Sequence, residues 1–375
     1  MTRKMSDGLL NHMSHRLLRR FTAKVCGRGI RILFVHRVLD DSVSEERDWP
    51  RALGHPTRSE FERKIRYLVR HYRPITLDMC VELLRSGEPP QEEYCVITFD
   101  DGYADNLRNA CPVMREYRVP ATFFVSTGVI GTSSLLWVDQ IYHAFACAER
   151  GMLTSEWLGA EMPLETLRER MVAAKGMANL MKRLSGRERA RRHAALLDWL
   201  GGAGPVSERD RMLRLDEIRE IARDPLFSLG GHTRWHPILS RSASETAERE
   251  IGECRDDIRH LIGEPPRHFA YPNGKERDFT PLHAQLVRRA GFDSASTTED
   301  GTNLPGADLY SLRRVPLVPL KWVNAAGRHF DEPLVHFGLR MAGVREVKQW
   351  ARTRLRKRAR RATGDASPAR SRERP

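Results

Sequence analysis

Residues 94–102 read Tyr-Cys-Val-Ile-Thr-Phe-Asp-Asp-Gly, an apolar run that ends in two aspartates and a glycine. The run predicts a buried strand. Successive side chains of an extended strand point to opposite sides, so Asp100 and Asp101 cannot both face the same way. One can bind a metal ion while its neighbour, displaced by the turn that Gly102 permits, reaches a substrate as a base.

A second polar segment, His232-Thr-Arg-Trp-His236-Pro237, follows another apolar run and supplies two imidazoles. Histidines four residues apart lie on one face if the segment turns helically. Two imidazoles and one carboxylate leave room for a water molecule on a divalent ion. An aspartate pair alone is more often a turn with a helix cap. The pair and the two histidines together predict a metal site built for hydrolysis.

Predicted strands and helices alternate on both sides of these segments. The expected strands are 30–36, 94–99, 121–126, 227–231, 268–271, 294–297 and 313–316. The expected helices are 61–72, 78–86, 106–117, 215–223, 242–262 and 282–290. Such alternation implies parallel strands joined by crossover helices. Each polar segment follows a strand, so the segments should meet at the carboxyl ends of the strands, as in α/β barrels.

The segment from about 139 to 211 interrupts this alternation with a helical, charge-rich pattern, which indicates a helical insertion. We therefore expect three parts. Residues 1–28 form a basic amphipathic helix, residues 29–330 form the catalytic barrel with its insertion, and residues 331–375 form a basic C-terminal helix and a disordered tail. A chain of 375 residues is long enough for one large domain of this kind.

The composition is that of a globular protein, with 40% hydrophobic and 30% charged residues. No stretch approaches the roughly 20 apolar residues of a membrane helix. The six cysteines form no CxxC pair, which argues against a structural zinc knot or a disulfide framework. The N-terminus lacks the features of a cleaved secretory signal, so a cytoplasmic location is expected.

The net charge of +14 is concentrated near the C-terminus, where residues 340–375 hold 13 Lys or Arg and three acidic residues. With the basic helix expected at 7–27, this tail favours peripheral contact with an anionic membrane at its inner face. The alternatives are a helix packed on the domain and a solvated, frayed tail. Nucleic acid is not an expected partner, and salt-dependent binding to DNA would indicate otherwise.

Three motifs together resemble those of the polysaccharide deacetylase family, also known as the NodB homology group or carbohydrate esterase family four. Residues 98–102 are similar to its first motif and residues 232–237 to its second. Phe269-Ala-Tyr-Pro-Asn-Gly274 is similar to a variant of the third, which also occurs in deacetylases of poly-N-acetylglucosamine. The resemblance covers roughly residues 30–320. It implies a distorted (β/α)₇ barrel that hydrolyses the N-acetyl group of an amino sugar.

The resemblance also implies roles for the motif residues. Asp100 is then the catalytic base, while Asp101, His232 and His236 hold a divalent metal ion. That ion is most often Zn²⁺, with Co²⁺, Ni²⁺ and Fe²⁺ as alternatives. The metal would polarise the acetyl carbonyl and hold the attacking water, whose proton Asp100 takes.

The third motif departs from the Arg-Pro-Pro found in many members, because Ala270-Tyr271-Pro272 stands there instead. In the family that arginine orients the base, so Arg314 on the last strand is the candidate to replace it beside Asp100. The loop after Tyr271 is expected to supply an oxyanion donor, namely the backbone N–H of Asn273.

The general acid is a further departure, because the family's late Leu-x-His motif is missing near 315–320. His36, at the end of the first strand, is the best candidate. Its alternative is a structural histidine satisfied by its neighbours, and His329 is a weaker competitor. Trp137 and Tyr103 are expected to line the sugar groove, with simple packing as the alternative for Trp137.

These observations predict a metal-dependent hydrolase that removes N-acetyl groups from amino sugars of a bacterial polysaccharide or a lipid-linked glycan intermediate. One alternative keeps the barrel and the metal but hydrolyses another amide, such as a formamido sugar or a cyclic ureide. A non-catalytic glycan-binding protein is a third possibility, although all four motif carboxylates and histidines are present.

Overall fold

The computed structural model describes residues 17, 20–22, 24, 27–317 and 334–343. The chain divides into two compact units, Met1–Arg28 with Pro333–Pro375 and Gly29–Glu332. In the first unit, the hydroxyl of Thr22 donates a hydrogen bond of 2.8 Å to the carbonyl of Ala342, just after helix α13 (Leu334–Met341). Most of the expected helix at 7–27, His329 and the basic tail lie outside the described residues.

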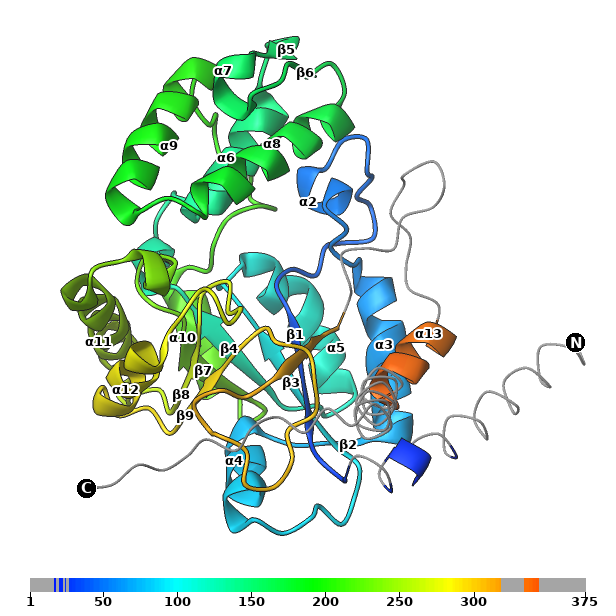
Figure 1. Cartoon of the computed structure of the whole chain (residues 1–375). Helices are drawn as coiled ribbons and strands as arrows, with labels where there is room; N and C mark the ends of the chain where they lie inside the picture. The colour runs from blue at the N-terminus through cyan, green and yellow to red at the C-terminus, as the bar shows by residue number, and fades with distance from the viewer. Residues whose placement is uncertain (1–16, 18–19, 23, 25–26, 318–333, 344–375) are drawn as a thin grey trace, which may run out of the picture. The chain divides into compact units, whose positions relative to one another are not determined.

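Parallel strands form a nearly closed barrel in the second unit (Figure 1). Their order is β10-β1-β3-β4-β7-β8-β9, and every neighbouring pair is parallel. A parallel bridge between Ser296 and Leu312 joins the two ends of this order. The predicted (β/α)₇ barrel is thus confirmed. The strands are β1 (Arg31–Val35), β2 (Arg73–Pro74), β3 (Tyr94–Phe99), β4 (Ala121–Val125), β7 (Phe227–Gly231), β8 (His268–Ala270), β9 (Ser294–Ser296) and β10 (Arg314–Pro316).

Helices follow the strands on the outside of the barrel. They are α3 (Arg58–His71), α4 (Leu77–Ser86), α5 (Cys111–Glu116), α10 (Leu215–Arg223), α11 (Ser244–Ile262) and α12 (Pro281–Arg289), whereas the short helix α2 (Trp49–Ala52) packs against the insertion. Short turns η1 (Asn106–Ala110), η2 (Thr127–Val129) and η3 (Leu239–Arg241) accompany them. Helix α3 begins three residues before the expected position because Thr57 and Glu60 form a capping box. The expected helix 106–117 starts as a π-helical turn, since Pro112 has no N–H for the regular bonding pattern.

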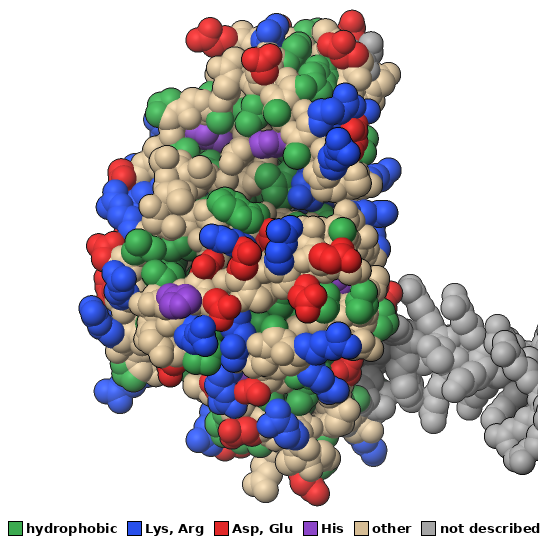
Figure 2. Space-filling model, turned by 90° about the vertical axis from the view of Figure 1, so that its left-hand side faces the viewer, with side chains coloured by type: hydrophobic (Ala, Val, Ile, Leu, Met, Phe, Trp, Pro, Cys, Tyr) green, Lys and Arg blue, Asp and Glu red, His purple; other side chains and the backbone are tan. Residues whose placement is uncertain are grey.

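Charged side chains of both signs cover the surface. Figure 2 shows one face, on which Lys and Arg intermix with Asp and Glu. Surface pairs such as Arg234 with Glu253 and Arg267 with Asp293 join opposite charges. Among the described helices, none is long and apolar enough to cross a membrane.

The segment between β4 and β7 forms a subdomain with its own core. It contains α6 (Trp137–Cys147), α7 (Ser155–Leu158), α8 (Leu167–Met181) and α9 (Gly186–Leu200). The expectation of a wholly helical insertion was wrong in one respect, because β5 (Met152–Leu153) and β6 (Met162–Pro163) form an antiparallel pair. Two-residue strands are too short to produce an alternating pattern in the sequence.

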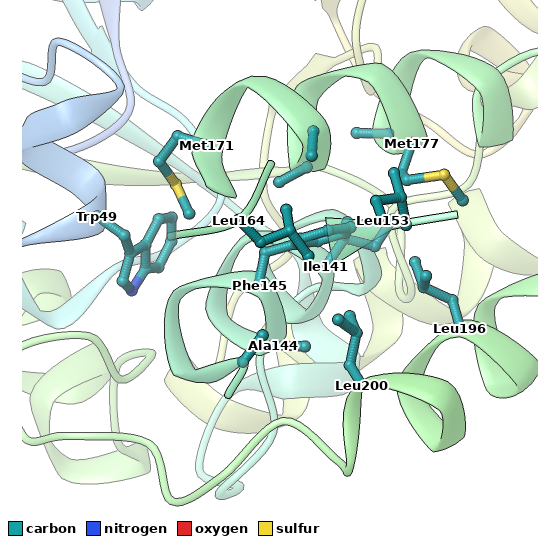
Figure 3. Close-up of a cluster of buried hydrophobic side chains, with 14 of the residues drawn as sticks. Trp49, Ile141, Ala144, Phe145, Leu153, Leu164, Met171, Met177, Leu196 and Leu200 are labelled. Atoms are coloured by element: carbon teal, nitrogen blue, oxygen red, sulfur yellow. The ribbon is translucent and has the colours of Figure 1, made fainter. Parts of the chain in front are cut away.

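Helices α6, α8 and α9 bury a shared apolar cluster (Figure 3). Its members include Trp49, Ile141, Phe145, Leu153, Leu164, Met171, Met177, Leu196 and Leu200. Trp49 belongs to α2, which follows β1, so two loops from the carboxyl ends of strands build one core. Since α2 follows β1 and α6 follows β4, the insertion lies beyond the carboxyl end of the barrel (Figure 1).

Candidate active site

A left-handed turn begins at the second of the two aspartates after β3. Asp101 has φ 79° and Gly102 has φ 93°, so the chain reverses immediately after Asp100. The N–H of Asp100 donates to the carbonyl of Val35 at 3.0 Å, which keeps Asp100 in line with the sheet. The two carboxylates are buried and reach different partners.

Asp101, His232 and His236 form a buried triad. Oδ1 of Asp101 lies 3.3 Å from Nε2 of His232 and 3.3 Å from Nε2 of His236. One ligand atom from each residue lies within 4.8 Å of the others. Among the described residues, no group makes a well-formed hydrogen bond to this Oδ1, although the atom is buried. A buried oxygen in that state, facing two ring nitrogens, fits a divalent cation.

The ring of His232 is oriented for metal binding. Its Nδ1 lies 2.7 Å from the carbonyl of Ala270, so Nδ1 carries the proton and Nε2 presents a lone pair toward Asp101. Burial lowers the pKa of His236 to about 3, which keeps that imidazole neutral at pH 7. Burial alone would raise the pKa of Asp101, but His232 and His236 hold it far below its ordinary value. Asp101 and His236 thus have the protonation that metal ligands need. Burial alone would lower the pKa of His232, but the hydrogen bond with Asp101 and the charges of Asp100 and Asp101 raise it above its ordinary value.

The segment 232–236 is a loop, so the condition under which a helical turn would align its histidines is not met. Thr233 and His236 have φ 63° and 53°, and the N–H of His236 donates to Oγ1 of Thr233 at 3.1 Å. Ser126 on the neighbouring loop donates its hydroxyl to the carbonyl of His232 at 3.0 Å. These bonds bring the two rings to a centroid distance of 4.9 Å.

Arg314 forms a two-point ion pair with Asp100, the residue that the sequence proposed as its partner. Its Nη1 donates to Oδ1 at 2.7 Å and its Nη2 to Oδ2 at 2.8 Å. Further bonds to Oγ1 of Thr98 and the carbonyl of Thr297 fix the guanidinium. Burial alone would raise the pKa of Asp100, but the charges of Arg314 and His232 lower it below its ordinary value. Asp100 is therefore an oriented, ionised carboxylate.

His36 follows β1 at the same end of the barrel. Its half-buried ring lies 5.7 Å from the ring of Phe34 and 6.4 Å from that of His55. Electrostatic interaction with His36 contributes to the lowered pKa of Asp100 and of Asp101.

Asn273, in the loop after β8, has φ 61° and a side chain held from two sides. Its Nδ2 donates to Asp278 at 2.6 Å, and its Oδ1 accepts from Nζ of Lys182 at 2.8 Å. Lys182 comes from the end of α8 in the insertion. Sequence analysis missed Lys182, because its contact with Asn273 joins residues far apart in the sequence and no local motif predicts it.

Two aromatic residues of the motif segments are buried. The hydroxyl of Tyr103 donates to Oδ2 of Asp139 at 2.6 Å, and the ring is buried, so Tyr103 does not border an open groove. Tyr271 is also buried: its ring stacks on Phe279 and its hydroxyl donates to the carbonyl of Tyr310. Both rings are held in the interior by residues distant in sequence, Asp139 for Tyr103 and Tyr310 for Tyr271.

Trp137 lies directly behind a metal-ligand candidate. Its Nε1 donates to the carbonyl of His236 at 2.9 Å, so this half-buried indole supports the histidine loop. Nearby, burial and the charge of Asp101 raise the pKa of Asp139 to about 7. Asp139 is the buried partner of Tyr103.

The parallel barrel thus carries, at the carboxyl ends of its strands, an aspartate paired with an arginine and a buried Asp-His-His triad. The model of the polysaccharide deacetylase family matches residues 87–295, which is more than half of the chain. The chain belongs to the polysaccharide deacetylase family.

Two curated relatives match a short part of the chain. YxkH of Bacillus subtilis (strain 168) is 34% identical over 85 residues, which is 22% of this chain and 30% of that protein. The poly-beta-1,6-N-acetyl-D-glucosamine N-deacetylase of Staphylococcus aureus (strain MSSA476) is 31% identical over 86 residues, 23% of this chain and 29% of that protein. The chain thus spans less than a third of the length of either relative.

Two solved structures share the fold over most of the chain. IcaB from Ammonifex degensii has a TM-score of 0.51 at 20% identity, over 78% of this chain and 93% of that one. The Streptococcus pyogenes deacetylase PplD, in complex with acetate, has a TM-score of 0.50 at 17% identity, over 81% and 99%. At these identities the likeness supports the barrel fold.

Proposed function

We propose that the protein is a metal-dependent hydrolase that removes N-acetyl groups from amino sugars of a bacterial polysaccharide or a lipid-linked glycan intermediate. One observation carries the proposal. An ionised carboxylate, Asp100, is clamped by Arg314 beside a buried triad of Asp101, His232 and His236.

The triad would hold a divalent ion. Two imidazoles and a carboxylate are typical ligands of Zn²⁺, with Co²⁺, Ni²⁺ and Fe²⁺ as alternatives. When bound, such an ion supplies Lewis-acid polarisation of a carbonyl and lowers the pKa of a water molecule.

Asp100 is the proposed general base. Each of its oxygens accepts one hydrogen bond from Arg314, which leaves lone pairs free to take the proton of the attacking water. Because Arg314 and His232 counteract the effect of burial on the pKa of Asp100, the base is ionised at neutral pH. The same clamp fixes the direction in which the carboxylate faces.

His36 is the proposed general acid, which donates a proton to the departing amine. The backbone N–H of Asn273 is the proposed donor to the oxyanion that forms at the acetyl carbon. The bonds of the Asn273 side chain to Asp278 and Lys182 support it by fixing that loop.

The substrate class rests partly on the relatives. The curated name of the Staphylococcus aureus relative specifies a poly-N-acetylglucosamine substrate. We further propose a cytoplasmic enzyme whose basic termini contact an anionic membrane surface, with no nucleic acid partner. The charge of residues 340–375 supports this part of the proposal.

Acetate release from N-acetylglucosamine oligomers and from a lipid-linked glycan extract tests the proposal. Metal-loaded wild type should release acetate, whereas Asp100→Asn and His232→Ala should lose about 10²-fold or more of the rate. Asp198→Asn is the matched control, because Asp198 is exposed on α9 away from the triad. If one metal binds per chain but no donor yields acetate, the substrate is another amide, such as a formamido sugar or a cyclic ureide, or the protein is non-catalytic.

A further inference from the structure

The insertion contributes two basic side chains to the surroundings of the triad. Lys182, which follows α8, donates to Oδ1 of Asn273 at 2.8 Å. The charges of Asp278, Asp101 and Asp139 act on Lys182, and that of Lys182 acts on His236. A cation from the subdomain therefore lies within electrostatic reach of two proposed metal ligands.

Arg189, on α9, is the second basic side chain. Its guanidinium lies over the ring of Trp137 at 4.7 Å from the centroid. The same indole donates through Nε1 to the carbonyl of His236. Arg189 is thus separated from a proposed metal ligand by one side chain.

The guanidinium of Arg189 is not satisfied by its own surroundings. Its Nη1 is buried, and no described residue accepts a hydrogen bond from it. By contrast, Arg191 and Arg192 on the same helix both bind Glu188 at 2.9 Å. A buried N–H without an acceptor is unfavourable in the free protein and becomes favourable when a ligand supplies the oxygen.

The nearby carboxylates are already engaged. Glu250 accepts from the N–H groups of Arg234 and Trp235, and Asp278 accepts from Asn273 and Lys275. Asp101 faces the two histidines. Asp278, Asp101 and Asp139 attract Lys182, and Glu250 attracts Arg189. Within the described part of the chain, however, neither cation forms an ion pair with a carboxylate, and Lys182 donates to Asn273.

We propose that Lys182 and Arg189 bind an oxyanion of the substrate, a phosphate or carboxylate group carried next to the N-acetylated sugar. This inference rests on the proposed deacetylase function and narrows its substrate to anionic glycans. Arginine over an aromatic ring and a nearby lysine are suited to such a group, because both donate charge-assisted hydrogen bonds.

Kinetics on matched sugars tests the inference. N-acetylglucosamine 1-phosphate and a disaccharide of glucuronic acid and N-acetylglucosamine carry the two candidate oxyanions, and methyl N-acetylglucosaminide carries none. Wild type should have a kcat/KM at least about tenfold higher for one or both anionic sugars, mainly through KM. The sugar with the advantage identifies the phosphate or the carboxylate as the source.

The variants Lys182→Met and Arg189→Met should each reduce the ratio of anionic to neutral kcat/KM several-fold, and Lys182→Arg should restore most of it. Lys175→Met, an exposed change on α8, is the control and should keep the wild-type ratio. The inference is overturned if wild type has no preference or if both methionine variants retain it. Thermal unfolding of each variant verifies that the insertion is folded.

A binding measurement separates this inference from the proposed function. Calorimetry compares glucosamine 1-phosphate with methyl glucosaminide, two products that need no turnover. Tighter binding of the phosphate, lost in Lys182→Met, supports the oxyanion site even if no acetate is ever released. Acetate release from all sugars, with equal binding of both products, would retain the deacetylase and reject the oxyanion site.

Discussion

Asp100 and Arg314 act as a pair whose two members lie 214 residues apart in the sequence. The guanidinium is fully buried and donates to both carboxylate oxygens, to Thr98 and to Thr297. Without that charge, burial would favour the neutral carboxylic acid. The arginine therefore determines whether Asp100 is a base at neutral pH.

Arg314→Met should move the acidic limb of the pH profile of kcat/KM to higher pH. The base acts only when ionised, and burial raises the pKa of Asp100 once the guanidinium is removed, so activity is lost at a higher pH as the pH falls. Arg314→Lys keeps the charge and should shift the limb less. An unchanged limb in Arg314→Met would mean that Asp100 is not the base.

Asp101→Asn should abolish tight metal binding while leaving the fold intact. The substitution keeps the shape but removes the negative charge that faces both imidazoles. Zinc at about 100 times Kd should stabilise wild type by about 2.7 kcal/mol, measured by thermal unfolding, and should not stabilise the variant. Asp198→Asn should respond to zinc like wild type. Equal stabilisation of Asp101→Asn would place the metal elsewhere.

The strands of the barrel could be predicted from sequence because each is an apolar run bounded by turn residues. All seven end within one residue of their expected bounds. The burial of the Tyr103 and Tyr271 rings could not be predicted from the sequence, because it depends on elements that are distant in sequence. Lys182 was missed for the same reason. The three motifs could be recognised because each is a short, continuous pattern of residues.

The insertion is stabilised by an apolar core separate from that of the barrel. Helix α9 contributes few side chains to this core. Leu196→Ala should destabilise α9 by about 2–5 kcal/mol, because Leu196 is fully buried in this cluster. Hydrogen exchange should show faster exchange in α9 and unchanged protection in β3. Val172→Ala, at an exposed position of α8, should cost less than about 0.5 kcal/mol. Equal effects of the two changes would contradict the separate core.

The closed order of strands brings together segments that lie far apart in the chain. Asp100 follows β3, the histidines follow β7 and Arg314 lies on β10, and all meet at one end of the barrel. The basic termini belong to the other compact unit. The proposed catalytic site and the proposed membrane contact thus belong to different units of the chain.

The whole chain should bind vesicles that contain anionic lipid, and binding should weaken as salt is added. Changing Arg356, Lys357 and Arg358 to Gln should weaken it by up to about 3 kcal/mol, measured by vesicle sedimentation. Vesicles of neutral lipid are the control. Equal binding to neutral vesicles, or tighter salt-dependent binding to DNA, would contradict the membrane proposal.

The backbone conformation at the site limits which substitutions can stabilise this protein without loss of the proposed metal ligands. Of the five described non-glycine residues with positive φ, four are Asp101, Thr233, His236 and Asn273, and the fifth is Arg118. Glycine adopts that conformation with less strain, so substitution by glycine is a usual route to a more stable backbone. At Asp101 and His236 the same substitution deletes a proposed metal ligand. Selection for heat resistance alone would therefore drive this chain toward an inert barrel.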